Sequence, residues 1–275
     1  MEVFQRRWVG TFIVILGVTF PIALGYLWLV LTSTNREVHG LWPIGGWELQ
    51  NWRFLWEPIG RRPMIWQVLL NTLIFAGGVS LLVVTVSAMA AYAISRMNFK
   101  GRGMFLGLVL VLHAFPAVSL LIATFYVLVM LRLFDSLLGV VLVMTAFMMP
   151  LGIWLLKGFF DNLSWDMEMA ALVDGASRFR IFFQIALPLA KPGLFALGIF
   201  SFLIAWGEFI LPYTFIASSR VWIFSIYLES LMGDLSATDF GLLTAVGLFY
   251  TLPAIVVFLL GQKYLLQMYY GGSKG

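Results

Sequence analysis

Glu208 is the residue whose chemistry is hardest to reconcile with the sequence around it. It is the only carboxylate of the apolar stretch 192–219, within the run FLIAWGEFILPYTF. An ionised carboxylate in lipid is costly, so such a residue faces the interior of a helix bundle, a water-filled path or the membrane interface. We predict that Glu208 and its neighbour Trp206 border a translocation path near its outer half; an interfacial position of Glu208 is the alternative. Pro212, one turn later, should weaken the helix and leave a backbone carbonyl free.

Residue types for covalent or metal chemistry are scarce. The chain has no cysteine, and its two histidines, His39 and His113, lie far apart and offer no ligand spacing. The apolar stretches contain neither a His-Glu-x-x-His nor a Gly-x-Ser-x-Gly motif, and the chain has no Gly-x4-Gly-Lys-Ser/Thr loop for a nucleotide. We therefore predict that the chain is not an enzyme, holds no metal or cofactor, and does not hydrolyse ATP itself.

A second concentration of polar residues, segment 164–192, lies between the fourth and fifth apolar stretches. Ser164 can cap a helix whose first turn holds Asp166 and Glu168, where negative charge complements the positive end of the helix. Gly175 can end that helix, because glycine tolerates the left-handed conformation that a helix stop requires. The sequence therefore predicts a short, sharply terminated helix at this point.

The same segment predicts a second short helix and a return to the apolar sequence. Ser177 can cap this helix, and Pro188 and Pro192 stop it and turn the chain. In the first helix, the small side chains of Ala170 and Ala171 allow another protein backbone to approach closely. We interpret the segment as a rigid knob on which another protein pushes.

The elements that must position these residues are apolar helices. Hydrophobic residues make up 61% of the chain, charged residues 11%, and the mean hydropathy is +0.96, which is typical of membrane proteins. Six long stretches are nearly free of charge, and each can supply the roughly 20 apolar residues that cross a bilayer. We predict an all-α membrane protein with one transmembrane domain over 1–275, with spans at about 9–31, 67–95, 104–131, 137–157, 193–216 and 241–262, an outer loop at 32–66 and a coupling loop at 161–192.

The basic residues indicate orientation rather than a nucleic-acid partner. The net charge is +4, but the 17 lysines and arginines are dispersed through the loops. With six spans both ends lie on one side, and most of the basic residues fall on that side. The positive-inside rule therefore favours both termini in the cytoplasm.

The order of residues in the knob resembles the EAA loop of ABC importer permeases. The resemblance is carried by Ala170, Ala171, Asp174, Gly175 and Ala176, followed after eight residues by Ile185, Leu187, Pro188 and Pro192. The run NTLIFAGGVSLLVVTVSAMAAYAISRMNFKGR resembles the second span and basic turn of the MalG-like sugar permeases, and AWGEFILP resembles their fifth span. Nearly the whole chain from about Asn71 is covered by the resemblance.

This resemblance implies the fold and the partners. The fold would be the MetI-like, type I ABC importer permease fold, in a bacterial inner membrane protein with several spans. The partners would be a second, MalF-like permease, two copies of a cytoplasmic subunit that binds ATP and Mg, and an external binding protein that delivers a carbohydrate. The knob would then be the coupling helix that enters a groove of the ATPase.

One position departs from the family pattern. The glutamate that precedes the two alanines in the family is Met169 here, and Glu168 lies one position earlier, about 100° around a helix. A carboxylate contact to the ATPase then requires Glu168 to swing toward it. We include both residues among the coupling residues and expect packing to supply more docking energy than a salt bridge. Ala171→Trp should accordingly be severe and Glu168→Gln mild.

Two alternatives remain open at this point. An ion-coupled secondary transporter would normally carry several intramembrane carboxylates and inverted repeats, whereas this sequence shows one such carboxylate and no convincing repeat. The same importer architecture also serves polyols and glycerol-phosphate-type substrates, and the charge of the chain does not choose among these substrate classes.

Overall fold

The computed structural model of this chain describes residues 2–35, 38–39, 42–43, 45–232 and 238–271. Almost all of these residues are helical, apart from loops and a short ladder of two two-residue strands, β1 (Val38–His39) and β2 (Trp42–Pro43). The chain divides into two compact units, one made of Met1–Ile65 with Leu228–Leu252 and the other of Trp66–Tyr227 with Pro253–Gly275.

The first unit contains α1 (Glu2–Ser33), the two strands, the 3₁₀ helix η1 (Gln50–Leu55) and the beginning of α12 (Phe240–Gly271). Asn51 joins the loop to the end of α1, since its Nδ2 donates to the carbonyls of Ser33 at 3.2 Å and Asn35 at 2.9 Å. Phe54 is fully buried, and its ring packs against those of Trp52 and Phe249. Polar and aromatic contacts therefore hold the loop between the first two long helices.

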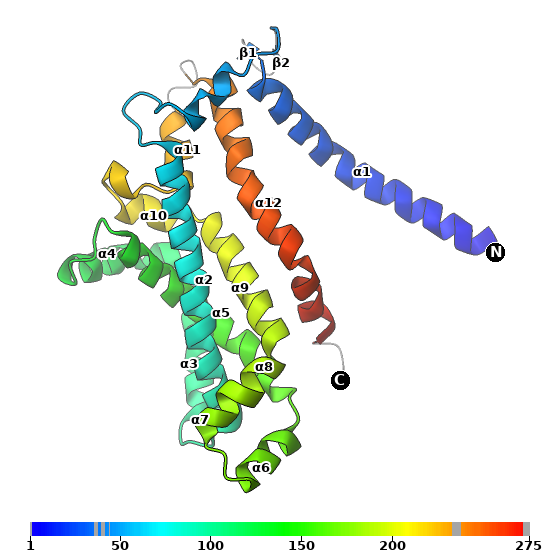
Figure 1. The fold of residues 1–275 in the computed structure, drawn as a ribbon, viewed down its shortest axis with the longest axis vertical. Coiled ribbons are helices and arrows are strands. Elements are labelled where there is room, and N and C mark those ends of the chain that lie inside the picture. Colours follow the sequence, from blue (N-terminus) through cyan, green and yellow to red (C-terminus); the bar gives the residue numbers. More distant parts are fainter. Residues whose placement is uncertain (1, 36–37, 40–41, 44, 233–237, 272–275) are drawn as a thin grey trace. The chain divides into compact units, whose positions relative to one another are not determined.

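The second unit is a bundle in which α2 (Ile65–Arg96), α5 (Leu137–Asp161) and α9 (Lys191–Trp206) run side by side (Figure 1). These helices approach closely where their residues are small. A Cβ at Gly152 of α5 would lie 2.5 Å from the Oγ of Ser87 on α2, so only glycine permits this packing. The unit also contains α3 (Arg102–His113), α4 (Leu121–Met130), α10 (Ile210–Phe215), the start of α11 (Phe224–Leu231), the end of α12 and the short helices between α5 and α9.

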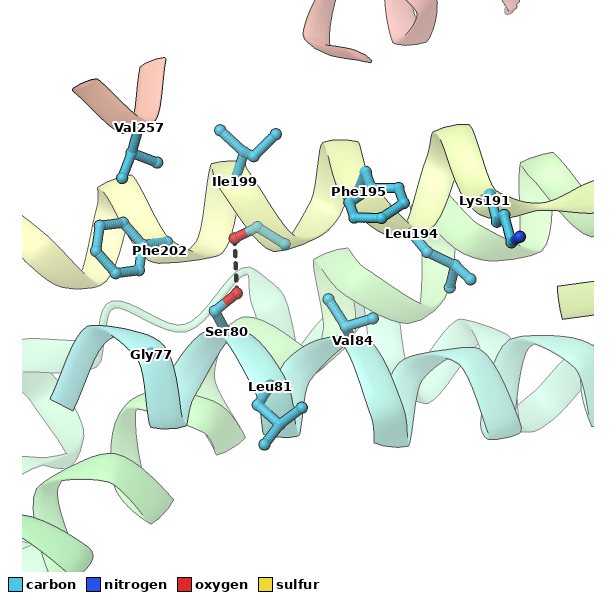
Figure 2. A pocket seen from close by; sticks show the side chains of 11 residues that line it. Gly77, Ser80, Leu81, Val84, Lys191, Leu194, Phe195, Ile199, Phe202 and Val257 are labelled. Carbon is cyan, nitrogen blue, oxygen red and sulfur yellow. Dashed lines mark hydrogen bonds between the residues drawn. The ribbon is translucent and has the colours of Figure 1, made fainter. Parts of the chain in front are cut away.

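A groove of about 540 Å³ lies between α2 and α9, with Val257 of α12 at its edge (Figure 2). Its lining is apolar apart from Ser80 and Lys191. The Oγ of Ser80 donates a hydrogen bond of 2.7 Å to the carbonyl of Gly198, which fixes the middle of α2 to α9. The two helices are thus joined at mid-length by a polar contact within an apolar surface.

Four helices among the described residues are long and apolar enough to cross a membrane: Val14–Ser33, Ile65–Arg96, Leu137–Asp161 and Phe240–Leu265. The predicted spans 104–131 and 193–216 are not continuous helices. The first is interrupted after α3 at Pro116, because proline lacks an N–H and restricts the residue before it. The second ends at Trp206 and resumes at Ile210.

Candidate functional site

The predicted knob begins with α6 (Trp165–Val173), at the end of the second unit where α2 also ends (Figure 1). The Oγ of Ser164 accepts a hydrogen bond of 3.3 Å from the backbone N–H of Asp166, as predicted for an N-cap. Gly175 ends the helix with φ of +82°, and the N–H groups of Gly175 and Ala176 donate to carbonyls of the last turn at 3.0 and 2.9 Å. These two bonds form a Schellman motif, so the predicted glycine stop is confirmed.

The second half of the knob is also helical. Ser177 caps α7 (Arg178–Ile181), and its Oγ accepts a backbone N–H from the first turn at 3.3 Å. A π-helical turn, η3 (Phe182–Ala186), and a short α8 (Leu187–Leu189) follow. The helix axis then bends by 74° into α9, at the position of the two predicted prolines. The segment is therefore a bent helical hairpin with defined ends.

The exposed side of α6, which we call the outward face, consists of Asp166, Met169, Ala170 and Val173. These positions follow the i, i+3, i+4, i+7 spacing of one side of a helix. Met169 and Val173 are 47% and 84% exposed. Ala171 is half-buried and lines a hollow of about 240 Å³ behind the helix. Of the two predicted alanines, Ala170 thus lies on the outward face and Ala171 beside it, because adjacent residues of a helix point about 100° apart.

Glu168, predicted as a coupling residue, points into the chain and is 2% exposed. Its Oε1 accepts a hydrogen bond of 2.7 Å from the Nε of Arg96, the last residue of α2, and its Oε2 accepts one of 3.1 Å from the hydroxyl of Tyr92. Arg96 also donates from Nη2 to the carbonyl of Leu163 at 2.8 Å and lies over the ring of Trp165. The carboxylate of Glu168 is therefore engaged within the chain, so Glu168→Gln removes an internal ion pair, and a contact of Glu168 with a partner stays a prediction.

The remaining predicted coupling residues lie within the hairpin. Asp174 and Pro188 are exposed, whereas Ala176, Ile185 and Leu187 are half-buried. The hollow behind α6 is lined by Ala171, Asp174, Ala176, Arg180, Ile181, Gln184 and Ile185.

Sequence reasoning missed Arg96 and Tyr92, which it treated as part of a span and its basic turn. Their spacing was a usable signal, since residues four apart lie on one face of α2.

The other predicted site lies where the fifth span is interrupted. The Oε1 of Glu208 accepts the backbone N–H of Leu211 at 3.1 Å, so the carboxylate caps the start of α10. Pro212 cannot donate to the carbonyl of Glu208, and that carbonyl instead accepts a hydrogen bond of 2.8 Å from the Oγ of Ser225. As predicted, this carbonyl has no partner in its own helix, and it is bonded instead by a side chain of α11.

Trp206 is buried within the chain. Its side chain is 2% exposed and lies against the rings of Phe202, at a centroid distance of 5.7 Å, and Phe224, at 6.1 Å. Trp206 thus packs between its own helix and α11, and the call that it borders a translocation path stays a prediction. Glu208 is half-buried, which leaves its carboxylate partly accessible.

Asp135 ties the loop after α4 to the loop after α10. Its Oδ1 accepts backbone N–H groups from Ala217 and Ser218, both at 2.8 Å, and the hydroxyl of Ser218 at 3.2 Å. Burial favours the protonated carboxyl, but these hydrogen bonds outweigh burial and lower the pKa of Asp135 below its usual value. The loop connection thus depends on the ionised carboxylate.

Among the residues that the structure describes, no group of three or more acidic or histidine side chains is placed to hold a metal ion.

The fold is that of a known class of membrane transporter. A chain in a crystal structure of a bacterial ABC transporter involved in the import of the acidic polysaccharide alginate superposes on this one with a TM-score of 0.76. The match covers 96% of this chain and 95% of that chain at 19% sequence identity. The chain therefore has the MetI-like, all-α fold of ABC importer permeases.

The sequence comparisons identify the family. The family described as "Binding-protein-dependent transport system inner membrane component" matches residues 83–267, and the chain belongs to this family. The trehalose/maltose transport system permease protein of Thermococcus litoralis is 30% identical over 263 residues, which are 94% of this chain and 92% of the relative. The diacetylchitobiose uptake system permease protein of Streptomyces coelicolor is 31% identical over 221 residues, 79% of this chain and 71% of the relative.

Proposed function

We propose that this chain forms half of the translocation path of an ATP-driven importer for a carbohydrate that an external binding protein delivers. Membership of the permease family supports the transport role. The names of the two relatives, for trehalose or maltose and for diacetylchitobiose, support a carbohydrate as the substrate. The second candidate is a polyol or a glycerol-phosphate-type substrate carried through the same architecture.

The observation that carries this proposal is the outward face of α6. Met169, Ala170 and Val173 lie on the exposed side of a helix that is capped at both ends. An apolar patch exposed in this way marks a surface that binds another molecule. An apolar, small-residue face on a rigid helix suits insertion into a groove of another protein. The partner that fits is a cytoplasmic ATP-binding subunit, of which the transporter would hold two copies, each with ATP and Mg.

The proposed arrangement of the chain follows from the same reasoning. The whole chain forms one permease domain with six spans and pairs with a second, MalF-like permease in a bacterial inner membrane. Both termini lie in the cytoplasm with α6, in accordance with the positive-inside distribution of the basic loops. The chain itself binds no metal or cofactor, and ATP hydrolysis belongs to the partner.

Glu208 is the proposed path residue of the outer half. Its carboxylate is half-buried and caps α10 at the interruption of the fifth span. An interrupted helix is tolerated at membrane depth where it lines a cavity or is buried in protein, which supports this position for the path.

The test is reconstitution into vesicles, with uptake of labelled maltose, trehalose, diacetylchitobiose and glycerol phosphate measured separately. The four-part transporter with its binding protein should take up one of the sugars only when ATP is enclosed. Uptake of glycerol phosphate alone would favour the second candidate. Uptake by this chain alone, driven by an ion gradient, would establish a secondary transporter and contradict the proposal.

A further inference from the structure

The one buried side chain of α6, a helix whose residues are all described, is the carboxylate of Glu168. Of the large apolar residues of this helix, Leu172 is half-buried, and four are exposed: Trp165, Met167, Met169 and Val173. No apolar side chain of α6 is fully buried, so apolar packing alone holds this helix less firmly than it holds a core helix. A charge pair with Arg96 of α2, at 2.7 Å and with side chains 8% and 2% exposed, adds to this packing.

The guanidinium of Arg96 holds the start of α6 at three points. It donates to Glu168 in the helix and to the carbonyl of Leu163 before it, and its Cζ lies 4.8 Å from the centroid of the Trp165 ring. Because the guanidinium is planar and its donors point in fixed directions, it restricts both the rotation and the sliding of the helix that it binds. The single ammonium group of a lysine could not do this. The end of α2 and the start of α6 are thus held in one relative orientation.

An aromatic cluster packs beside the Arg96–Glu168 pair. Tyr92, one turn before Arg96, donates its hydroxyl to Glu168 and packs its ring against Phe160 of α5 and Phe182 of η3, at 5.5 and 4.9 Å. The carboxylate therefore meets a donor from each of two successive turns of α2. Its position is fixed by α2 rather than by α6 alone.

The other end of α2 is fixed to the segment before α11. The Nδ2 of Asn71 donates to the carbonyls of Arg220 and Trp222, both at 2.9 Å, and the Oγ1 of Thr72 accepts the N–H of Phe224 at 2.9 Å. The next residue of α11, Ser225, donates its hydroxyl to the backbone carbonyl of Glu208 at the interrupted span. Because α2 is a proline-free helix of 32 residues, about 48 Å long, it joins these two sites as a single rod.

We propose that Arg96 and Glu168 form the joint through which α6 moves α2, so that α2 carries the displacement from the docking helix to the interrupted span at Glu208. Glu168 is then a positioning residue and not a contact to the ATPase. This inference rests on the proposed function, because the displacement comes from the ATPase that docks on α6.

The test uses the complete reconstituted transporter with Glu168→Gln and Arg96→Met, each alone and combined. Two quantities are measured: the amount of ATPase that copurifies, and the number of substrate molecules transported per ATP hydrolysed. Each single variant should retain the ATPase and lower the transport per ATP by about fivefold or more, as for loss of a typical coupling between sites. The combined variant should be no worse than the more severe single one, since both remove the same link.

The matched control is Lys157→Gln, which removes the more exposed Lys157–Asp161 ion pair of α5 near the same end of the unit. It should leave the transport per ATP unchanged.

A lower yield of complex with normal transport per ATP would reduce the pair to a structural role and overturn the inference. The proposed function fails separately, if the wild-type complex shows no ATP-dependent uptake or if Ala170→Trp leaves ATPase binding intact.

Discussion

The knob and the interrupted span differ in the kind of side chain that each buries. In the knob, Glu168 is buried and Met169 and Val173 are exposed. At the interrupted span, Trp206 is buried and the carboxylate of Glu208 binds a neighbouring backbone N–H. Apolar side chains are exposed in both regions, as at Val173 and Ile210, but in the knob they share one side of a short helix with Ala170, and this is the surface proposed for docking.

The largest expected effect is on that uncovered surface. Ala170→Trp adds bulk to the centre of the outward face and should prevent the ATPase from seating, with at least a tenfold loss of binding, about 1.4 kcal/mol or more. Copurification of the ATPase with this chain measures the effect. Asn162→Trp, which places the same bulk on an exposed residue before α6, should retain the ATPase. Equal behaviour of the two variants would place docking elsewhere.

The next effect concerns the turn that orients the outward face. Gly175→Val forces a β-branched residue into a φ of +82°, at a cost of about 1–3 kcal/mol, and opposes the Schellman motif. The end of α6 should fray, which faster hydrogen exchange of its backbone amides would reveal, and ATP hydrolysis should uncouple from transport. Gly158, a helical glycine of α5 with open space around its Cα, is the matched position, and Gly158→Ala should change neither quantity. Unchanged exchange in Gly175→Val would contradict the strain argument.

A smaller effect is expected at the interrupted span, because that region is satisfied internally. Glu208→Gln keeps an oxygen that can accept the Leu211 N–H and removes only the charge. Assembly should be unchanged, and the rate of uptake should shift by a few-fold, about 1 kcal/mol in the barrier. A silent substitution would confine Glu208 to its capping role and remove it from the path.

The smallest effect is the acid sensitivity of the Asp135 connection. Because the folded pKa of Asp135 is lowered, its ionised form adds stability above the usual carboxyl pKa of about 3.9, and this stability is lost as the pH falls toward the folded pKa. Thermal unfolding should show a contribution of about 1 kcal/mol or less, since water screens a partly exposed carboxylate. Asp135→Asn should remove this part of the acid dependence; an unchanged acid profile would show that the connection does not need the charge.

The sequence predicted the features of the site that depend on local backbone chemistry. The caps at Ser164 and Ser177, the stop at Gly175 and the free carbonyl before Pro212 all follow from residues within one helical turn of each other. Such signals are local, so one sequence is enough to read them.

The directions of the side chains could not be predicted in this way. Glu168 forms an ion pair with Arg96, which lies 72 positions away in the chain, and Trp206 packs on Phe224 of a different helix. Each depends on which side of a helix meets a neighbour, and in a chain that is 61% hydrophobic the apolar pattern hardly distinguishes one side from another. The interruption at Pro116 was missed for a related reason, because uniform hydropathy conceals a break within an apolar run.

Site-directed labelling tests the docking account most directly, since the chain has no cysteine of its own. Val173→Cys and Glu168→Cys would be treated with a water-soluble maleimide, in the permease pair alone and in the complex with its ATPase. The thiol at 173 should react rapidly in the permease pair and become protected when the ATPase binds, whereas the thiol at 168 should react slowly in both. Equal reactivity at 173 with and without the ATPase would contradict the claim that the outward face of α6 is the docking surface.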